Sequence, residues 1–234
     1  MGHRTMIATA VLTGLVAQAL AQGQAQTYDL SLRPVKGQKT TYSLTFDITG
    51  QGDKMTVKAK LVNEIVDVKD DGTFIAASYQ SDHQLFINDK PQKTTPGTVT
   101  GVTTYDKFGR PLKVGGDDAG TETMRIARLT SYVAPEGPVK VGDSWKDFMP
   151  ADKDAGTPSV AHTYTLQSVD MKDGRQVATI EVATSETSEV HPGSTQGILT
   201  LDVKTGEQLS YEVQVGNFPV GGQYVDGKVT LVRE

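Results

Sequence analysis

Hydrophobic and polar residues alternate along most of the chain. The clearest stretch is 40–49, where alternate positions carry Thr40, Tyr42, Leu44, Phe46 and Ile48, and the positions between them are Thr, Ser and Asp. Successive side chains of a β-strand point to opposite faces of the sheet. The pattern therefore predicts a strand with one buried face and one wet face.

The same alternation predicts strands throughout both halves of the chain. They are expected at 55–69, 74–79, 84–87, 98–105 and 112–114, and again at 161–170, 176–184, 197–203, 208–215 and 222–232. Turn residues such as Asp70-Asp71-Gly72 separate neighbouring strands. Within 55–69 the apolar phase shifts between Leu61 and Val62, which predicts a β-bulge near Asn63.

One stretch has the period of an amphipathic α-helix. Apolar residues recur at i, i+3 and i+7 from Ile126, Asp117 or Asp118 can cap the N-terminus, and Pro135 ends the pattern. We expect a helix near 117–133 that packs its apolar stripe against a sheet.

The segment after this helix contains the single tryptophan of the chain. Gly137-Pro138 indicates a loop, and Gly142-Asp143 indicates a tight turn that folds Trp145 back onto the chain. A tryptophan beside a turn is typical of a core residue whose N–H donates to a carbonyl, and the alternative role is stacking on a ligand. We place the boundary between a first part, 22–134, and a second part, 135–234, at this segment.

Short motifs of the first part recur in the second part in the same order. Pro34-Val35-Lys36 returns as Pro138-Val139-Lys140, Val66–Asp70 returns as Val169–Asp173, Pro96-Gly97 returns as Pro192-Gly193, and Asp106 with Gly109 returns as Asp202 with Gly206. This predicts an internal duplication within one compact domain. The fold class is then mainly β, with two related antiparallel meanders that form a curled sheet or open barrel. The pattern leaves open whether they form one sheet or two packed sheets.

The N-terminus and the composition predict an exported protein. Met1–Arg4 is positively charged, residues 6–20 are mostly apolar, and Ala19-Leu20-Ala21 provides a cleavage site, so 1–21 reads as a signal peptide cleaved after Ala21. The 234 residues include no cysteine, which excludes a lipid-anchored cysteine and disulfides and favours a bacterial envelope protein, periplasmic or extracellular. No later apolar run is long enough to span a membrane. The net charge of −5 disfavours nucleic-acid partners.

Motifs for catalysis or cofactors are missing from the sequence. Gly142-Asp143-Ser144 resembles the start of a GDSL esterase block, but that chemistry needs Asp three residues before a late histidine, and Ser188 stands at that position before His191. No P-loop, dinucleotide fingerprint or Gly-x-Ser-x-Gly is present. A glycosidase carboxylate pair leaves no local spacing, although the few aromatic residues disfavour a sugar cleft. They are also too few for the girdles of an outer-membrane barrel.

The remaining histidines do not predict a metal site. His83, His162 and His191 have no second histidine at ligand spacing. Asp82 precedes His83, but adjacent strand residues face opposite ways, so the two are not expected to share a site. Asp152 and Asp154 lack the third acidic position and distal glutamate of a calcium loop.

The chain resembles an uncharacterised group of secreted bacterial β-rich proteins. The resemblance lies in the signal peptide, the alternating strands, and a helix followed by Pro-x-x-Pro-Val-Lys-Val-Gly-Asp-Ser-Trp at 135–145. The group implies no activity. The expected architecture is also similar to that of periplasmic lipoprotein carriers of the LolA type, in which an unclosed barrel and helices enclose an apolar cavity.

These observations favour a non-enzymatic protein that binds an apolar ligand or an envelope partner. The expected ligand-binding residues, between the curled sheet and the helix, are Tyr42, Phe46, Ile126, Leu129 and Trp145. The alternative is a structural or interaction module of the envelope with a filled core, and a hydrolase is the third reading. No catalytic residue, cofactor or metal is expected.

Overall fold

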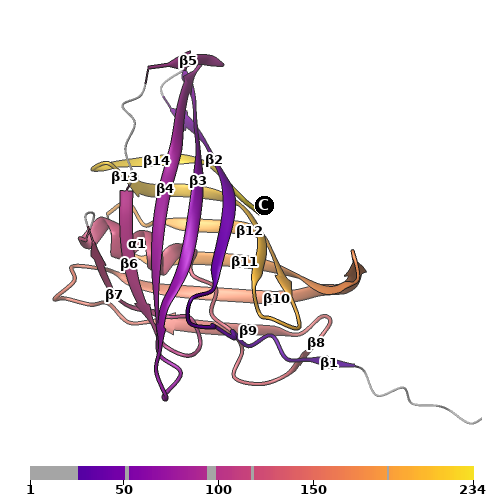
Figure 1. The fold of residues 1–234 in the computed structure, drawn as a ribbon. Helices are drawn as coiled ribbons and strands as arrows, with labels where there is room; N and C mark the ends of the chain where they lie inside the picture. The colour runs from indigo at the N-terminus through magenta and orange to yellow at the C-terminus, as the bar shows by residue number, and fades with distance from the viewer. Residues whose placement is uncertain (1–25, 51–52, 94–98, 117–118, 189) are drawn as a thin grey trace, which may run out of the picture.

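The computed structural model describes residues 26–50, 53–93, 99–116, 119–188 and 190–234 (Figure 1). The predicted signal peptide and the Pro96-Gly97 motif lie outside these residues. The elements of the first half are β1 (Thr27–Tyr28), β2 (Lys39–Gly50), β3 (Asp53–Val68), β4 (Phe74–Ile87), β5 (Lys90–Gln92), β6 (Val99–Tyr105), β7 (Pro111–Gly116) and α1 (Thr121–Thr130). Those of the second half are β8 (Val139–Lys140), β9 (Ser144–Met149), β10 (Ser159–Lys172), β11 (Arg175–Thr187), β12 (Ser194–Asp202), β13 (Gln208–Val220) and β14 (Gln223–Arg233).

The long strands form one antiparallel sheet. Its order is β7-β6-β4-β3-β2-β14-β13-β12-β11-β10-β9, with β5 added to β4, while β1 and β8 form a separate two-stranded sheet. The last strand, β14, pairs with β2, for example Val229 opposite Phe46, and so joins the two halves. The prediction of a mainly β, curled antiparallel sheet with one helix is confirmed, and the two meanders belong to one sheet rather than two.

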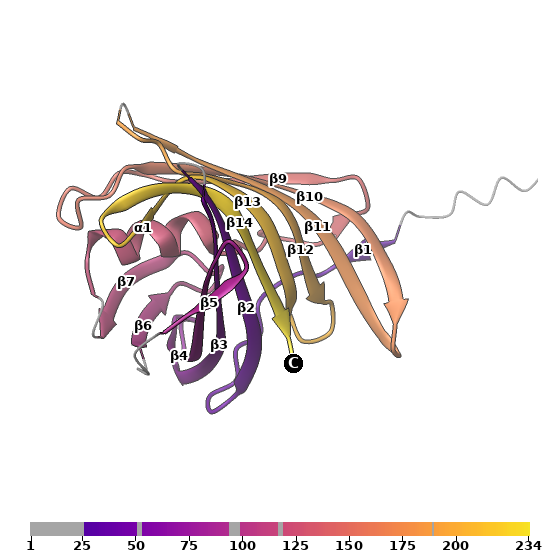
Figure 2. The same cartoon turned by 90° about the horizontal axis from the view of Figure 1, so that it is seen from above.

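The sheet curls without closing. In Figure 1 the strands β2, β3 and β4 run across the direction of β9 to β13, and Figure 2 shows α1 inside the curl, beneath the second-half strands. The strands β7 and β9 stand at the two ends of the hydrogen-bonded order. Strong curling over many strands follows from the twist of each strand and from bulges.

The core lies between the second-half strands and α1. Strand β10 alternates strictly between half-buried and fully buried residues from Ser159 to Leu166, because one face packs inward. The largest fully buried side chains are Tyr164, Leu30, Leu129, Leu166, Ile180, Leu199, Leu201, His162, Val133, Val160, Val213 and Thr195. Most of them come from the second half, so the second meander and the helix supply most of the apolar burial that stabilises the fold.

The helix is shorter than the sequence predicts. It begins at Thr121 with Gly120 at the N-cap and no side-chain cap, and the predicted caps Asp117 and Asp118 lie outside the described residues. It ends at Thr130, so Val133, which completes the predicted apolar stripe, is buried in an extended segment instead. The backbone turns extended at Ser131, and the peptide groups of Val133 then hydrogen-bond to the side chains of Tyr164 on β10 and Trp145 on β9.

The predicted bulge near Asn63 is wrong in position. Asn63 sits opposite Ser78 in regular register, and the irregularities of the β3–β4 pair fall on either side, between Lys58 and Lys60 and between Ile65 and Asp67. The two strands predicted at 74–79 and 84–87 are one strand, β4, that continues through the first irregularity. Strand β9, which contains Trp145, was not predicted, although its exposed and more buried residues alternate.

Candidate functional site

The residues predicted to bind an apolar ligand lie in or against the core. Leu129 on α1 has no exposed surface, and Ile126 packs against the same cluster while remaining half-buried. On β2, Phe46 makes an edge-to-face contact with Phe218 at a centroid distance of 5.9 Å.

Tyr42 is the most buried of the predicted residues on the first-half sheet. Its hydroxyl donates to the carbonyl of Gln208, 3.0 Å away, and burial raises the pKa of Tyr42 to about 12. The buried phenol thus has a backbone acceptor for its proton, as tyrosines packed in a core usually do.

Trp145 belongs to a packed aromatic cluster. Its indole stacks on Tyr164 at 5.3 Å and meets the edge of Tyr132 at 6.4 Å. The indole N–H donates to the carbonyl of Val133 at 2.9 Å, as expected for a tryptophan held in a core. The tight turn at Gly142-Asp143 is also present: Gly142 has φ 92°, and the N–H of Asp143 donates to the carbonyl of Lys140.

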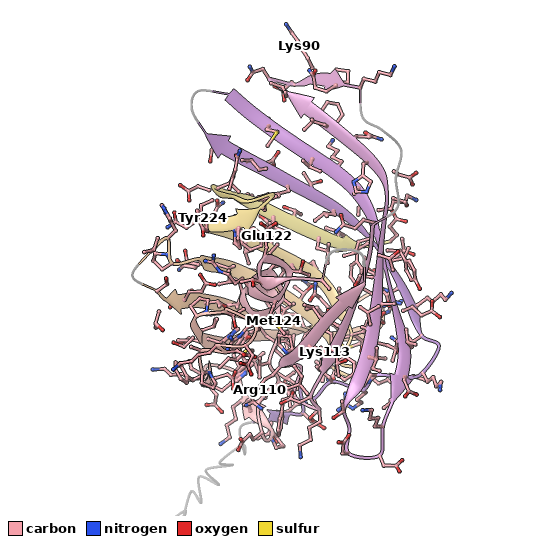
Figure 3. The ribbon with its side chains drawn as sticks, turned by 90° about the vertical axis from the view of Figure 1, so that its left-hand side faces the viewer. Lys90, Arg110, Lys113, Glu122, Met124 and Tyr224 are labelled. Carbon is pink, nitrogen blue, oxygen red and sulfur yellow. The ribbon has the colours of Figure 1, made fainter. Side chains whose placement is uncertain are left out.

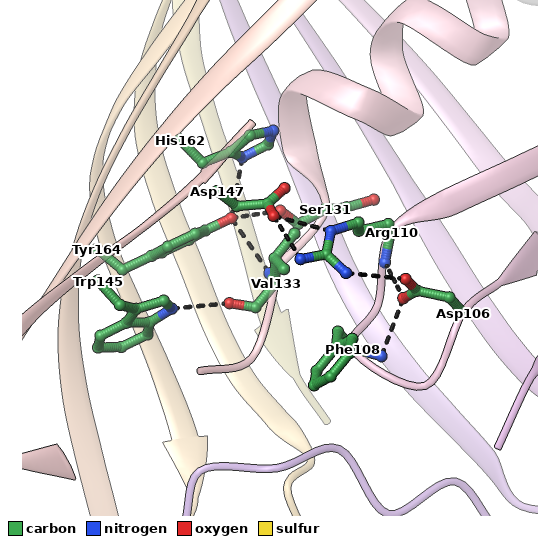
Figure 4. A network of polar contacts seen from close by, with 9 residues as sticks. All are labelled: Asp106, Phe108, Arg110, Ser131, Val133, Trp145, Asp147, His162 and Tyr164. Atoms are coloured by element: carbon green, nitrogen blue, oxygen red, sulfur yellow. Dashed lines mark hydrogen bonds and ion pairs between the residues drawn. The ribbon is translucent and has the colours of Figure 1, made fainter. Parts of the chain in front are cut away.

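A network of buried polar groups continues from this cluster (Figure 4). The hydroxyl of Tyr164 donates to the carbonyl of Ser131 at 2.9 Å and accepts from the N–H of Val133 at 3.2 Å. It also lies 3.0 Å from Nδ1 of His162. Burial raises the pKa of Tyr164 well above its usual value and lowers that of His162 to about 4, so both side chains are neutral at pH 7.

The network includes an ion pair between the two ends of the sheet. Arg110, just before β7, directs Nε and Nη2 at Oδ1 of Asp147 on β9, at 2.8 and 2.6 Å. Its Nη1 contacts Asp106 at 3.1 Å. The side chain of Asp147 is only 6% exposed, and these hydrogen bonds to carboxylates raise the pKa of Arg110 above its usual value.

Two arginines of α1 reach polar partners on the second half, which the predicted apolar stripe did not anticipate. Arg125 pairs bidentately with Glu186, whose side chain is fully buried, at 2.9 and 2.5 Å. Arg128 is buried and donates to Thr157 and to the carbonyl of Pro150. The one sequence signal for this was the i, i+3 spacing of Arg125 and Arg128, which places both on the same side of the helix.

The helix N-terminus is fixed to the β13–β14 hairpin. Both carboxylate oxygens of Glu122 accept backbone N–H groups, from Gly221 and Gly222, at 2.8 Å each. Figure 3 shows Glu122 and Met124 on the helix and Tyr224 near the same end of the molecule. Tyr224 stacks on His191 at 4.5 Å and lies beneath the guanidinium of Arg125. These contacts attach the helix to the sheet and leave its polar groups satisfied.

An open recess of about 440 Å³ lies on the outer, polar face of β2, β3 and β4. It is lined by Ser43, Leu44, Thr45, Lys58, Ala59, Lys60, Asp82, His83, Gln84 and Glu234. A second hollow, of about 410 Å³, continues along β3 past Lys58 towards Lys54 and Phe86. Within this surface Lys60 pairs with Glu234 and Lys54 with Asp89, whereas Lys58 lies over the ring of Phe86, with Nζ 5.4 Å from the ring centroid.

Asp82 and His83 both contribute atoms to the lining of this recess, as do sequence neighbours such as Ser43 and Leu44. Asp82 is exposed whereas His83 is half-buried with Nε2 shielded from solvent, so their opposite orientation stays a prediction. Asp82 has φ 54°, and Asp82 and His83 together stand opposite Ala59, as in a β-bulge. The extra residue breaks the alternation, and a non-glycine residue in the left-handed region is uncommon and often marks a functional position.

Other site classes find little support among the described residues. No cluster of three metal-ligating side chains occurs in the described ranges. Asp152 instead accepts the backbone N–H groups of Asp154 and Ala155, so it caps a turn. In the same ranges, none of the helical structure is long and apolar enough to cross a membrane. Comparison of the chain with protein-family models, curated proteins and solved structures finds no match.

Proposed function

We propose that this chain is a non-enzymatic interaction module of the cell envelope, exported through its N-terminal signal, and that the recess on β2, β3 and β4 is its recognition surface. The observation that carries the proposal is the position of the recess. It lies on the wet face of the sheet, whereas the residues predicted to line an apolar cavity are packed in or against the core. Of the two binding hypotheses, an apolar ligand or an envelope partner, the recess therefore favours the envelope partner.

The chemistry of the recess favours a polar partner. Ser43, Thr45 and Gln84 offer hydroxyl and amide groups. Lys58 offers an ammonium group, which lies over the ring of Phe86. Such groups, spaced along neighbouring strands, suit an extended polar segment that hydrogen-bonds across the sheet face. Asp82, which is exposed at the bulge of β4, adds a carboxylate to the lining of the recess.

An apolar ligand is the second candidate, and two observations support it. Phe46 and Ile126 remain half-buried although they face the interior of the curl. The curled sheet with one helix inside it is also the architecture that the similarity to LolA-type carriers implies. In this reading the ligand would enter between β2 and α1 and cover these two side chains.

We also propose that the two halves arose by duplication, and their hydrogen bonds support this. Near β2, the N–H of Gly37 donates to Ile65, that of Gln38 to Val35, and that of Ile65 back to Gln38. The turn before β9 repeats this scheme, from Gly142 to Leu166, Asp143 to Lys140, and Leu166 back to Asp143. Both glycines have positive φ, 82° and 92°. The meander β2-β3-β4-β6-β7 then corresponds to β9-β10-β11-β12-β13.

Site-specific photocrosslinking in an exporting host tests the main proposal. A photoreactive amino acid replaces Ser43 in the recess or, as a matched control, Gln196 on the outer face of the second-half strands. We expect a discrete crosslinked partner from position 43, none from 196, and loss of the crosslink when Lys58→Glu is added. Equal crosslinking from both positions would contradict recognition at the recess.

Native mass spectrometry of residues 22–234, purified without detergent, separates the two candidates. A lipid-sized adduct that leaves on activation would support the apolar ligand. A clean protein mass together with the crosslink from position 43 would support the interaction module.

A further inference from the structure

Two buried polar atoms of the network in Figure 4 have no hydrogen-bond partner among the described residues. They are Nε2 of His162 and Oδ2 of Asp147. His162 on β10 stands directly opposite Asp147 on β9 in the strand register. Side chains at such paired positions lie on the same face and close together. Buried polar atoms are nearly always hydrogen-bonded, so this adjacent pair calls for an explanation.

The hydrogen bonds of Tyr164 determine which nitrogen of His162 carries the proton. The phenol has one proton, which it donates to the carbonyl of Ser131. The contact of 3.0 Å between its oxygen and Nδ1 of His162 must therefore use a proton on Nδ1. A neutral imidazole has only one N–H, so Nε2 carries a lone pair and can only accept.

Asp147 also offers only an acceptor at this place. Both guanidinium contacts from Arg110 go to Oδ1, which leaves the lone pairs of Oδ2 unused by the residues described. Arg128 from α1 and Arg110 also act on His162 through their positive charges, and the hydroxyl of Thr184 on β11 lies 3.4 Å from Nδ1 rather than Nε2. Nε2 of His162 and Oδ2 of Asp147 are thus two buried acceptors, on residues paired across β9 and β10, to which the described residues supply no hydrogen bond.

We propose that Nε2 of His162 and Oδ2 of Asp147 bind one internal water molecule, which donates one O–H to each. Water suits the site because it is small and supplies two donors at once, and buried waters typically bridge polar groups of this kind. A divalent cation would need more ligands and would face the positive charges of Arg110 and Arg128. A direct His162–Asp147 bond would need a proton on Nε2, which the contact with Tyr164 excludes.

This water would extend the connection between the ends of the sheet. Arg110 already joins the start of β7 to Asp147 on β9. The bridging water would link Asp147 to His162, which hydrogen-bonds to Tyr164 and through it to the carbonyl of Ser131 after α1. Asp147 then has both oxygens satisfied, which a buried carboxylate requires.

A crystal structure at about 1.2 Å resolution, from metal-free buffer at pH 7, tests the proposal directly. We expect one fully occupied oxygen within hydrogen-bond distance of both atoms. A direct His162–Asp147 hydrogen bond, a metal ion or the lack of any bound atom would each overturn it.

Two solution measurements on the unaltered protein and on variants give independent tests. Long-range ¹⁵N–¹H NMR of the histidine ring should show the Nδ1–H tautomer of His162 at pH 7, and a proton on Nε2 would contradict the proposal. Water ¹⁷O relaxation dispersion should show one long-lived water fewer in His162→Leu and no change in the exposed control His191→Leu. If His162→Leu does not fold, the NMR measurement of the His162 tautomer in the unaltered protein still tests the proposal.

Discussion

Nη2 of Arg110 lies 2.6 Å from Oδ1 of Asp147, and this contact joins the two end strands of an antiparallel sheet that backbone hydrogen bonds leave open. A closed barrel would satisfy both edges by strand pairing. Here a partly buried ion pair and the segment after α1 lie between the two ends instead. These side chains link the ends of the open sheet, and the effect of removing them on stability should be measurable.

Breaking this ion pair should destabilise the fold. Asp147→Asn removes the charge that accepts two hydrogen bonds from Arg110. Because the Arg110 side chain is 30% exposed and keeps its contact with Asp106, we expect a loss of about 1.5–3 kcal/mol of unfolding free energy. Urea denaturation followed by circular dichroism measures the change. The matched control is Asp89→Asn, because Asp89 pairs with Lys54 at the exposed surface and should cost less than about 1 kcal/mol. Equal effects of the two variants would show that the Arg110–Asp147 ion pair contributes no more to stability than an exposed ion pair.

Truncation of Trp145 should also be costly. Trp145→Ala removes the stack on Tyr164 and the hydrogen bond to Val133, and we expect a loss of about 3–5 kcal/mol. Trp145→Phe keeps most of the packing and loses mainly the hydrogen bond, so its cost should be about 1 kcal/mol. Circular dichroism, rather than the lost tryptophan fluorescence, reports unfolding. A loss under about 1 kcal/mol for Trp145→Ala would place the ring outside the core and raise the ligand-stacking role again.

His162 should make stability depend on pH. Burial is the main cause that lowers its folded pKa to about 4; nearby Asp147 raises it, and Arg128 and Arg110 lower it further. The unfolded pKa is about 6.5, so the contribution is complete above pH 6.5 and is lost as the pH falls towards 4. The loss is on the order of 3 kcal/mol over this window. The difference in stability between the unaltered protein and His162→Gln should shrink over the same window, and a difference that does not change with pH would contradict this role of His162.

The carboxylate of Glu122 should hold the β13–β14 turn in place. Glu122→Gln replaces one of the two oxygens that accept from Gly221 and Gly222, and a hydrogen bond to a charged group is worth about 1.5–3 kcal/mol. Amide hydrogen exchange at Gly221 and Gly222 should accelerate in this variant. Glu136→Gln, at an exposed position, is the control and should leave both rates unchanged. Unchanged exchange in Glu122→Gln would mean that the turn is fixed by the hairpin alone.

The short-range parts of the fold were predictable because they depend on neighbouring residues. Alternation located the long strands, the tight turn at Gly142-Asp143 formed as expected, and Trp145 donates its N–H to a carbonyl. The errors occurred where distant contacts compete with local preference. The helix ends at Thr130, although its apolar period continues, because the following residues are held by β9 and β10.

The candidate sites depended on tertiary structure to a greater extent. The recess combines residues of β2, β3 and β4 with Glu234, and β4 bulges beside it opposite Ala59, which alternation alone does not predict. Arg110 and Asp147 are distant in the sequence, and nothing local pairs them. Likewise, Tyr42 and Leu129 read equally well as cavity lining or as core, and their burial identifies them as core.

The sequence by itself determined that this is a mainly antiparallel β protein with one helix, a turn before Trp145 and recurring motifs, because period and turn chemistry are set within a few residues. Only the tertiary structure decided that the two meanders form one open sheet, that its ends meet through Arg110 and Asp147, and that polar groups lie beneath α1. The physical reason is that strand pairing and the burial of charge depend on which distant residues meet, and a one-dimensional pattern does not contain that information.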